Sequence, residues 1–319
     1  TRARREAIVT YFKNGLNGEE ELPSQFIGEI KAESEEGGAM AREAIFAEPV
    51  AVQDSGSVGN LIKSLFSHYG FSVTMLNNYL ECPWKYFYNN LLRIPKAKER
   101  HQLYGSAIHA ALKDFFDKRK MGADREFLLQ KFEYYLGKEA LRKNEFAEFL
   151  ERGKRALSGY YDKNGGLWGD NVLTEFAING ILLTPEIKLT GKIDKMTIAE
   201  NGGVIVADYK TGKPKTRGEI EGTTKNSNGD IKRQLVFYNL LLNMHENGRY
   251  RMAGGEIDFV EPNEKGDYKK ESFVILPEEV VELEGLIKKV AAEILNLEFW
   301  DRRCGEKDCE FCGLRAMMG

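Results

Sequence analysis

The chain has 319 residues, of which 42% are hydrophobic and 30% are charged, and its formal net charge is −3. This length suits one large domain with an appendage, or two modest domains. There is no run of about 18 apolar residues, and the first residues, TRARREAIVTYF, lack the layout of a signal peptide. We therefore expect a soluble, cytoplasmic protein without a membrane partner. The small net charge neither favours nor excludes nucleic acid, because a local patch matters more than the sum.

The first 94 residues predict three segments. Residues 1–30 combine an apolar stretch, a turn and a proline-led segment, which indicates a strand, a turn and a short helix. Residues 31–70 are rich in Glu, Gly, Ala and Ser with weak periodicity, which indicates a linker. Residues 71–94 begin with a Ser-x-Thr cap signal and continue with apolar and aromatic residues at helical spacing. This last segment predicts a buried or half-buried helix.

Helices are also predicted for the next 60 residues. Gly105 and Ser106 open a helix that continues through Phe116, and residues 123–163 predict two further amphipathic helices. Residues 82–163 carry 18 Lys and Arg against 11 Asp and Glu. Such an excess suits a nucleic-acid partner, but an ordinary solvated helical surface explains it equally well.

The sequence period then changes from helical to extended. Three β-rich runs separated by Asn-Gly, Thr-Pro and Asn-Gly-Gly turns predict adjacent antiparallel strands at 175–183, 187–199 and 203–212. The remaining chain predicts a helix, two strands and a final helix, over 231–245, 255–260, 271–276 and 277–296.

Two acids and a lysine lie within this extended region. Residues i and i+2 of a strand face the same side, so Asp208 and Lys210 project together, and the turn at 201–203 brings Asp194 beside them. Neighbouring carboxylates repel each other unless a cation lies between them, and Mg²⁺ or Mn²⁺ suits such oxygen ligands. The lysine ammonium could then orient a water or stabilise charge on a phosphoryl oxygen. The alternative is a surface hairpin with a routine Asp-Lys pair.

This arrangement resembles the core of the PD-(D/E)xK nuclease superfamily, specifically its RecB-like branch. The sequences GKID at 191–194 and ADYKTG at 207–212 match the two strand motifs. In that branch a helix before the sheet supplies a histidine, to which His109 in GSAIHAALKDFF corresponds. A later helix carries a Gln-x-x-x-Tyr motif, which Gln234 and Tyr238 match, and these residues border the active site and contact nucleic acid or steady the lysine.

The resemblance implies an α/β fold of the restriction-endonuclease-like type over residues 71–319. Its central mixed β-sheet is flanked by helices, and it carries a helical insertion and a C-terminal cysteine clasp. The catalytic residues that the resemblance implies are Asp194, Asp208, Lys210, His109, Gln234 and Tyr238.

The resemblance also implies a role for each group. Asp194, Asp208 and His109 would hold the metal, and Lys210 would steady the attacking water and the transition state. Glu175, at the start of the first predicted strand, is expected to be an acid outside the direct metal ligands.

The cysteines suggest a second metal site. Three of the four lie within nine residues, and this spacing in a cytoplasmic chain indicates a metal or cluster site rather than disulfides. In relatives with an iron–sulfur centre, one early and three late cysteines bind a [4Fe–4S] cluster. The corresponding residues are Cys82, Cys304, Cys309 and Cys312.

The spacing of these cysteines departs from the usual pattern of those relatives. After Cys312 comes GLRAMMG, with methionine where the last cysteine often stands, so Cys304, upstream of the other two, would have to serve instead. A four-cysteine Zn²⁺ site and free thiols are therefore alternatives to the [4Fe–4S] cluster.

Residues 1–30 resemble the end of a UvrD-like superfamily 1 helicase motor, with a Thr-Arg-Ala motif and a Pro-Ser-x-Phe segment. No Gly-rich loop ending in Lys-Ser or Lys-Thr occurs in the sequence, so we do not expect this chain to hydrolyse ATP by itself. The expected organisation is a motor fragment at 1–30, a linker at 31–70 and a RecB-like nuclease domain at 71–319.

We therefore expect a metal-dependent DNA nuclease, most simply an exonuclease acting on single strands delivered by a helicase motor in cis, in DNA repair or recombination. A partner subunit is compatible with this expectation. The alternatives are a catalytically inactive scaffold that binds DNA, and an enzyme directed at RNA. Base stacking is one role for four aromatic residues in the 71–94 helix, but their spacing favours the core: Trp84, Tyr86, Phe87 and Tyr88.

Overall fold

The computed structural model describes residues 55–169, 171–200 and 202–317, with the side chains from residue 58 onward. The chain divides into two compact units, Thr1–Gln53 and Asp54–Gly319, and every described residue belongs to the second. The predicted motor fragment at 1–30 and the first part of the predicted linker therefore lie outside the described residues.

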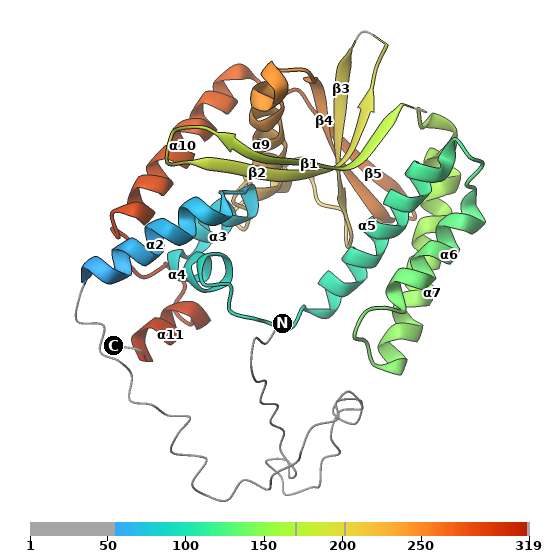
Figure 1. The fold of residues 1–319 in the computed structure, drawn as a ribbon. Coiled ribbons are helices and arrows are strands. Elements are labelled where there is room, and N and C mark those ends of the chain that lie inside the picture. Colours follow the sequence, from blue (N-terminus) through green and yellow to red (C-terminus); the bar gives the residue numbers. More distant parts are fainter. Residues whose placement is uncertain (1–54, 170, 201, 318–319) are drawn as a thin grey trace, which may run out of the picture. The chain divides into compact units, whose positions relative to one another are not determined.

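A mixed five-stranded sheet forms the centre of the unit, in the spatial order β1-β2-β3-β4-β5 (Figure 1). Neighbouring strands are antiparallel except β3 and β4, which are parallel. The prediction of three adjacent antiparallel strands is confirmed, and so is the mixed sheet. Strands β4 and β5 begin three to four residues before their predicted starts. The bounds are Val172–Leu182 (β1), Lys188–Ile198 (β2), Gly203–Lys210 (β3), Arg251–Pro262 (β4) and Tyr268–Phe273 (β5).

The first described helix corrects the predicted linker. Helix α2 covers Ser55–Tyr69, within the segment that was expected to be loosely packed. Its Ile62 and Phe66 are buried in the main hydrophobic core, at 1% and 3% exposure. The composition of residues 31–70 as a whole hid this helix, because its apolar positions occupy only the last third of the segment.

The predicted helix at 71–94 is interrupted. Helix α3 ends at Glu81, Cys82 adopts an extended conformation, and Pro83 begins helix α4. A proline lacks the backbone N–H that a continuing helix needs but fits the first position of a new one. Because of the break, Cys82 lies between two helices and does not continue the 3.6-residue repeat of α3. The segment consists of Val73–Glu81 (α3), Pro83–Tyr86 (α4) and the π-helix Phe87–Leu91 (η2).

A helical insertion lies beside the sheet. Helices α5, α6 and α7 stand together at one end of it in Figure 1 and enclose a second hydrophobic core cluster with Tyr209 and Val260 of the sheet. The two amphipathic helices predicted at 123–163 are confirmed. The helix through Phe116 is longer at both ends than predicted. The bounds are Arg100–Arg119 (α5), Arg125–Leu136 (α6), Lys143–Asn164 (α7) and Gly165–Leu167 (η3).

Helix α9 packs against the sheet through a glycine in the GKID segment. A Cβ added at Gly191 would stand 2.5 Å from Cδ1 of Leu241, so the missing side chain allows α9 to approach β2 closely. The helices predicted at 231–245 and 277–296 are confirmed as α9 and α10. The remaining helices are Arg217–Glu221 (α8), Asp230–Met244 (α9), His245–Asn247 (η4), Pro277–Leu295 (α10) and Glu310–Met317 (α11).

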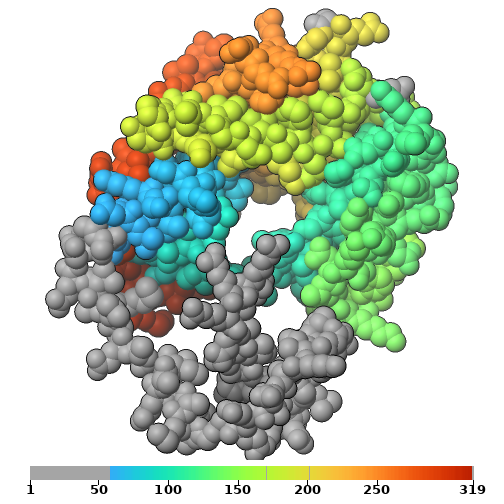
Figure 2. Space-filling view, in the orientation of Figure 1, coloured from blue at the N-terminus to red at the C-terminus, as the bar shows by residue number. Residues whose placement is uncertain are grey.

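The described unit is hollowed on one face. Figure 2 shows an opening between the surfaces of α2 and α3 on one side and α5 on the other, beneath β1 and β2. The four aromatic residues considered for base stacking lie in the main core instead, which confirms the packing interpretation: Trp84, Tyr86, Phe87 and Tyr88. Among the described residues, no helix has the length and apolar character that crossing a membrane requires.

Candidate active site

Strands β2 and β3 bring the predicted acids together. Their antiparallel register pairs Lys195 with Ala207, and the next position of the ladder holds Asp194, one residue before Lys195, and Asp208, one residue after Ala207. The backbone N–H of Tyr209 donates a hydrogen bond of 2.9 Å to Oδ2 of Asp194. A side-chain carboxylate thus takes the place of a ladder carbonyl at this point, and its orientation is fixed by the neighbouring strand.

Asp208 belongs to a closed ring of four interacting side chains. The Lys210 ammonium lies 2.8 Å from Oδ2 of Asp208 and donates a 2.9 Å hydrogen bond to Oε1 of Gln234. Nε2 of Gln234 donates to the Tyr238 hydroxyl at 2.7 Å, and that hydroxyl donates to Oδ1 of Asp208 at 3.3 Å. Gln234 and Tyr238 can act together because positions i and i+4 share one helix face. The Gln-x-x-x-Tyr pair therefore holds both the acid and the lysine.

Histidine 109 reaches the first acid from α5. Its Nδ1 lies 3.4 Å from Oδ1 of Asp194, and its ring meets the Tyr209 ring edge-on with centroids 5.9 Å apart. One ligand atom each from His109, Glu175 and Asp194 lies within 4.8 Å of the other two. Glu175, expected outside the direct ligands, is thus in the group that could hold a metal ion, while Asp208 lies beside it in the ring described above.

Glu175 has an unusual backbone. Its φ is +49°, although it lies inside strand β1. Thr174 and Phe176 on either side pair with residues of β2, whereas Glu175 has no pairing partner in that ladder. A non-glycine residue with this φ is strained, and such strain gathers at functional sites. Its carboxylate pairs with the Lys192 ammonium. Periodicity could not predict this displacement from the regular strand, so its place among the candidate ligands was missed.

Burial and charge act against each other in the site. Burial alone would lower the pKa of His109, but its hydrogen bond to Asp194 and the nearby acids raise it. Burial would raise the pKa of Asp194, yet the partnership with His109 holds it below its ordinary value. For Asp208, burial and the charge of Asp194 raise the pKa against the opposing Lys210 ammonium. Of the two aspartates, Asp208 is therefore the one whose ionised form a further cation would stabilise most.

The donor set fits a divalent metal. Carboxylate oxygens and an imidazole are ligands for Mg²⁺ and Mn²⁺, and a cation would relieve the mutual repulsion of the acids. His109, Glu175 and Asp194 would hold it. Asp208, the other predicted ligand, is not in this group, but its charge acts on both His109 and Asp194. When bound, such an ion supplies Lewis-acid polarisation of a phosphoryl oxygen and a more acidic water.

The cysteine clasp joins the two ends of the nuclease domain. Sγ of Cys82 lies 3.7 Å from Sγ of Cys312 and 3.7 Å from Sγ of Cys309. Sγ of Cys304 is 3.6 Å from Sγ of Cys312, and one sulfur from each cysteine lies within 4.8 Å of the others. Cys82 and Cys312 are buried, and all four are free of disulfides. The predicted set of four is thus gathered in one place.

These thiols fit a metal that binds thiolates. Burial raises the pKa of the Cys82 and Cys304 thiols, whereas hydrogen bonds from backbone and neighbouring thiols outweigh burial and lower the pKa of Cys309. A bound metal ion would stabilise the thiolates that burial disfavours. Zn²⁺ and an iron–sulfur cluster are both compatible with four clustered cysteines.

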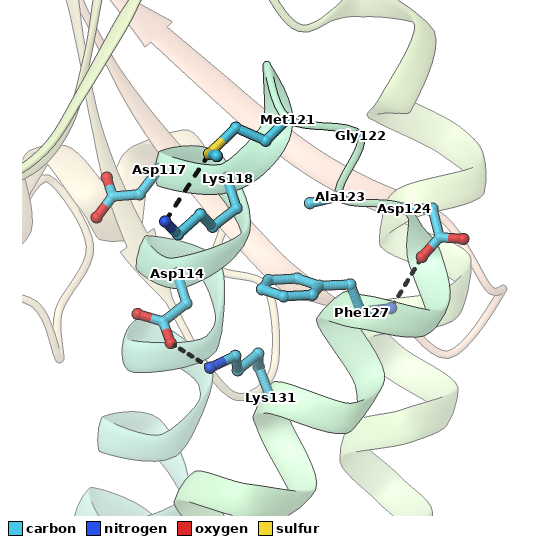
Figure 3. A pocket seen from close by; sticks show the side chains of 9 residues that line it. All are labelled: Asp114, Asp117, Lys118, Met121, Gly122, Ala123, Asp124, Phe127 and Lys131. Carbon is cyan, nitrogen blue, oxygen red and sulfur yellow. Dashed lines mark hydrogen bonds and ion pairs between the residues drawn. The ribbon is translucent and has the colours of Figure 1, made fainter.

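A separate hollow lies between α5 and α6, with a volume of about 590 Å³ (Figure 3). Its charged groups already have partners: Asp114 pairs with Lys131 at 3.1 Å, and Asp124 accepts a hydrogen bond from the N–H of Phe127 at the start of α6. None of the predicted site residues lines it. The hollow therefore does not belong to the candidate active site.

The mixed sheet with flanking helices and the grouped acids, histidine and lysine can be set beside a comparison of the sequence with known families. The sequence model of the PD-(D/E)XK nuclease superfamily matches residues 70–317. The chain belongs to this superfamily.

Solved structures offer weaker likenesses. A crystal structure described as a "Putative exonuclease" from Eubacterium rectale is 14% identical with a TM-score of 0.49, over 82% of this chain and 93% of that chain. The crystal structure of SSO0001 is 12% identical with a TM-score of 0.29, over 74% of this chain and 86% of that chain. No curated protein matches the chain. The assignment to the superfamily rests on the sequence match alone.

Proposed function

We propose that this chain is a Mg²⁺- or Mn²⁺-dependent deoxyribonuclease that hydrolyses phosphodiester bonds. The observation that carries the proposal is the convergence of His109, Asp194, Asp208 and Lys210 from one helix and two strands. An inactive scaffold has no need for a lysine and an acid held in a closed ring of interactions, beside a second acid paired with a histidine. The nuclease superfamily to which the chain belongs supports the same chemistry.

The chain's own groups would act as follows. His109, Asp194 and Glu175 supply lone pairs for the metal, and Asp208 adds negative charge to the site. Lys210 places a cation where the attacking water and the phosphoryl oxygens gather charge, and electrostatic groups held in place in this way lower the barrier most.

Two residues of α9 keep this arrangement in place. Gln234 keeps the lysine from rotating away, and Tyr238 orients the Asp208 carboxylate.

The test is cleavage of end-labelled single-stranded DNA in Mg²⁺ by the wild type and by Lys210→Ala. We expect the substitution to lower the rate by about 10² to 10³, the scale for losing one electrostatic group that acts in the transition state. Lys213→Ala is the matched control, because Lys213 lies three positions after Lys210, is exposed and pairs with Glu264. Equal rates for wild type and Lys210→Ala, or no cleavage by the wild type, would refute the proposal.

For the substrate and context, we propose single-stranded DNA cut exonucleolytically, in a helicase-nuclease of DNA repair or recombination. The support is the resemblance of the motifs at 191–194 and 207–212 to the RecB-like branch, and of residues 1–30 to a UvrD-like motor. On this proposal residues 71–319 form the nuclease domain and residues 31–70 include the connection to the motor. Competition between labelled DNA and unlabelled RNA tests the choice of nucleic acid, and efficient competition by RNA would contradict it.

We also propose that the cysteine clasp holds a metal, and that its sulfur separations favour a single Zn²⁺ ion over the [4Fe–4S] cluster that the resemblance implies. Four sulfurs around one ion at about 2.3 Å stand about 3.8 Å apart, close to the 3.6 and 3.7 Å between the thiols here. In a [4Fe–4S] cluster each thiolate binds a different iron, so the sulfurs must stand farther apart. The missing cysteine after Cys312 supports the same choice.

The colour and metal content of the freshly purified protein test this choice. We expect a colourless sample with one zinc per chain. A brown sample with visible absorbance and iron and sulfide in equal amounts would restore the cluster, and a metal-free sample would contradict both proposals.

A further inference from the structure

Glu261 makes a set of contacts that the proposed chemistry does not use. It lies at the end of β4 with 9% exposure. Its two carboxylate oxygens accept hydrogen bonds from Nε and Nη2 of Arg152 on α7, at 2.8 and 2.9 Å. The backbone N–H of Gly212 donates to the same carboxylate at 2.8 Å. One buried acid thus joins a helix of the insertion to the loop that follows strand β3.

That loop begins directly after the catalytic lysine. Gly212 is two residues beyond Lys210, and its φ of +103° belongs to a conformation that glycine alone adopts readily. The preceding residue, Thr211, passes close to α5, since a Cβ added at Gly105 would stand 3.1 Å from Oγ1 of Thr211. Gly105 lies one helical turn before His109. The loop therefore touches both the strand of the lysine and the helix of the histidine.

The Arg152 guanidinium links Glu261 to helix α5 as well. It lies over the Tyr104 ring of α5, 4.8 Å from the ring centroid, and it donates two hydrogen bonds to Glu261. An arginine held bidentately and stacked on an aromatic ring has little freedom to move. Helix α5, helix α7, strand β4 and the loop after β3 are thus tied to one another at Glu261.

We propose that Glu261 is a positioning residue: with Arg152, it fixes the Thr211–Gly212 loop and thereby sets the separation of Lys210 from His109. This proposal rests on the proposed nuclease function for its catalytic consequence, but not for its structural one. Misplacing a catalytic group by about 1 Å can cost 10²-fold in rate. A looser loop should therefore lower kcat without weakening substrate binding.

The experiment combines hydrogen exchange with kinetics on the full chain. Glu261→Ala removes the acceptor of the Gly212 amide and the partner of Arg152. Glu261→Gln keeps an oxygen for the Gly212 amide but loses the charge. The control is Asp162→Asn, on α7 like Arg152. The Asp162 carboxylate pairs with Arg125 through both of its oxygens, as Glu261 does with Arg152, but this pair is exposed. Exchange is followed in the peptide that spans Gly212, and kcat and KM are measured with labelled single-stranded DNA in Mg²⁺.

We expect Glu261→Ala to speed exchange at Gly212 at least tenfold and to lower kcat about tenfold, with KM within twofold of the wild type. Glu261→Gln should recover most of the protection and of kcat, because the amide oxygen still accepts the Gly212 N–H. Asp162→Asn should change neither quantity.

Two results would overturn the proposal: unchanged exchange at Gly212 in Glu261→Ala, or faster exchange with wild-type kcat. If the wild type cuts no DNA, the nuclease function fails, and exchange alone decides whether Glu261 fixes the loop.

Discussion

The candidate active site and the cysteine clasp both gather possible metal ligands from distant parts of the chain, but they differ in how the side chains are held. In the active site each ligand already has a partner, such as His109 for Asp194 and Lys210 for Asp208. In the clasp the four thiols lie against one another, and Cys82 and Cys312 are 230 positions apart in sequence. The first site is oriented before any metal arrives, while the second is a junction that a metal would complete.

The difference shows what the interactions in each site contribute, geometry in one and stability in the other. Buried charges held in pairs gain little net stability, because desolvation offsets their attraction. They fix geometry for a reaction instead. A cross-link between distant segments stabilises the fold, chiefly by restricting the unfolded chain. Substitutions in the active site should therefore change mainly the rate of cleavage, and substitutions in the clasp should change mainly the free energy of unfolding.

The largest effect on stability is expected at the clasp. Cys82→Ser should lower the free energy of unfolding of the metal-loaded protein by about 4 kcal/mol, the scale for opening a cross-link that closes a loop of more than 100 residues. The measurement is urea unfolding followed by circular dichroism, together with the metal content per chain. Metal-free wild type, prepared with a strong chelator, should match the variant. Wild-type stability in Cys82→Ser would show that the clasp is not a structural cross-link.

The largest effect on activity is expected at Asp208. Asp208→Asn removes the charge that Lys210 and the metal need, so cleavage of single-stranded DNA should fall about 10³-fold. The free energy of unfolding should fall less than at the clasp, because burial and the charge of Asp194 raise the pKa of Asp208, so the folded state already disfavours the charge that the substitution removes. The control is Asp301→Asn at an exposed position. A loss of stability as large as that at the clasp would erase the contrast between the two sites.

An intermediate effect is expected at Glu175, where it tests the composition of the metal site. Glu175→Gln keeps an oxygen donor but removes a negative charge from the group with His109 and Asp194. The Mg²⁺ concentration for half-maximal cleavage should rise about tenfold, the lower end of the range for losing a supporting ligand group. Titration calorimetry with Mn²⁺ gives the affinity without catalysis. Glu186→Gln, on the exposed turn before β2, is the control, and an unchanged metal affinity would place Glu175 outside the ligand set.

The two sites were also unequally predictable from sequence. The positions of Asp194, Asp208 and Lys210 follow from the period of two along strands joined by a short turn, and Gln234 and Tyr238 follow from helical spacing. These are local patterns, and the structure brings their residues together. The gathering of the four cysteines could be expected only by resemblance, since no local pattern relates Cys82 to residues more than 200 positions later.

Other features escaped prediction for physical reasons. Helix α2 lies in a segment whose average composition indicates a linker, and its burial depends on a core formed by residues far along the chain. Glu175 joins the metal group through a positive φ that no strand pattern encodes. The break at Cys82 was signalled by Pro83, but aromatic residues at helical spacing on both sides obscured it. Tertiary contacts, not local preference, decided the first two cases.

The smallest effect is expected at Tyr209, between the acid and the lysine on β3. Its hydroxyl is buried without a hydrogen-bond partner among the described residues, so Tyr209→Phe should leave activity within twofold and stability within about 1 kcal/mol of the wild type. Its ring, by contrast, meets His109 edge-on, and its backbone N–H holds Asp194. Tyr209→Leu keeps the N–H but loses the ring, so cleavage should fall about tenfold at similar metal affinity. If both variants cut DNA like the wild type, the histidine is oriented by Asp194 alone, and the active site depends less on packing than its pairs of charges suggest.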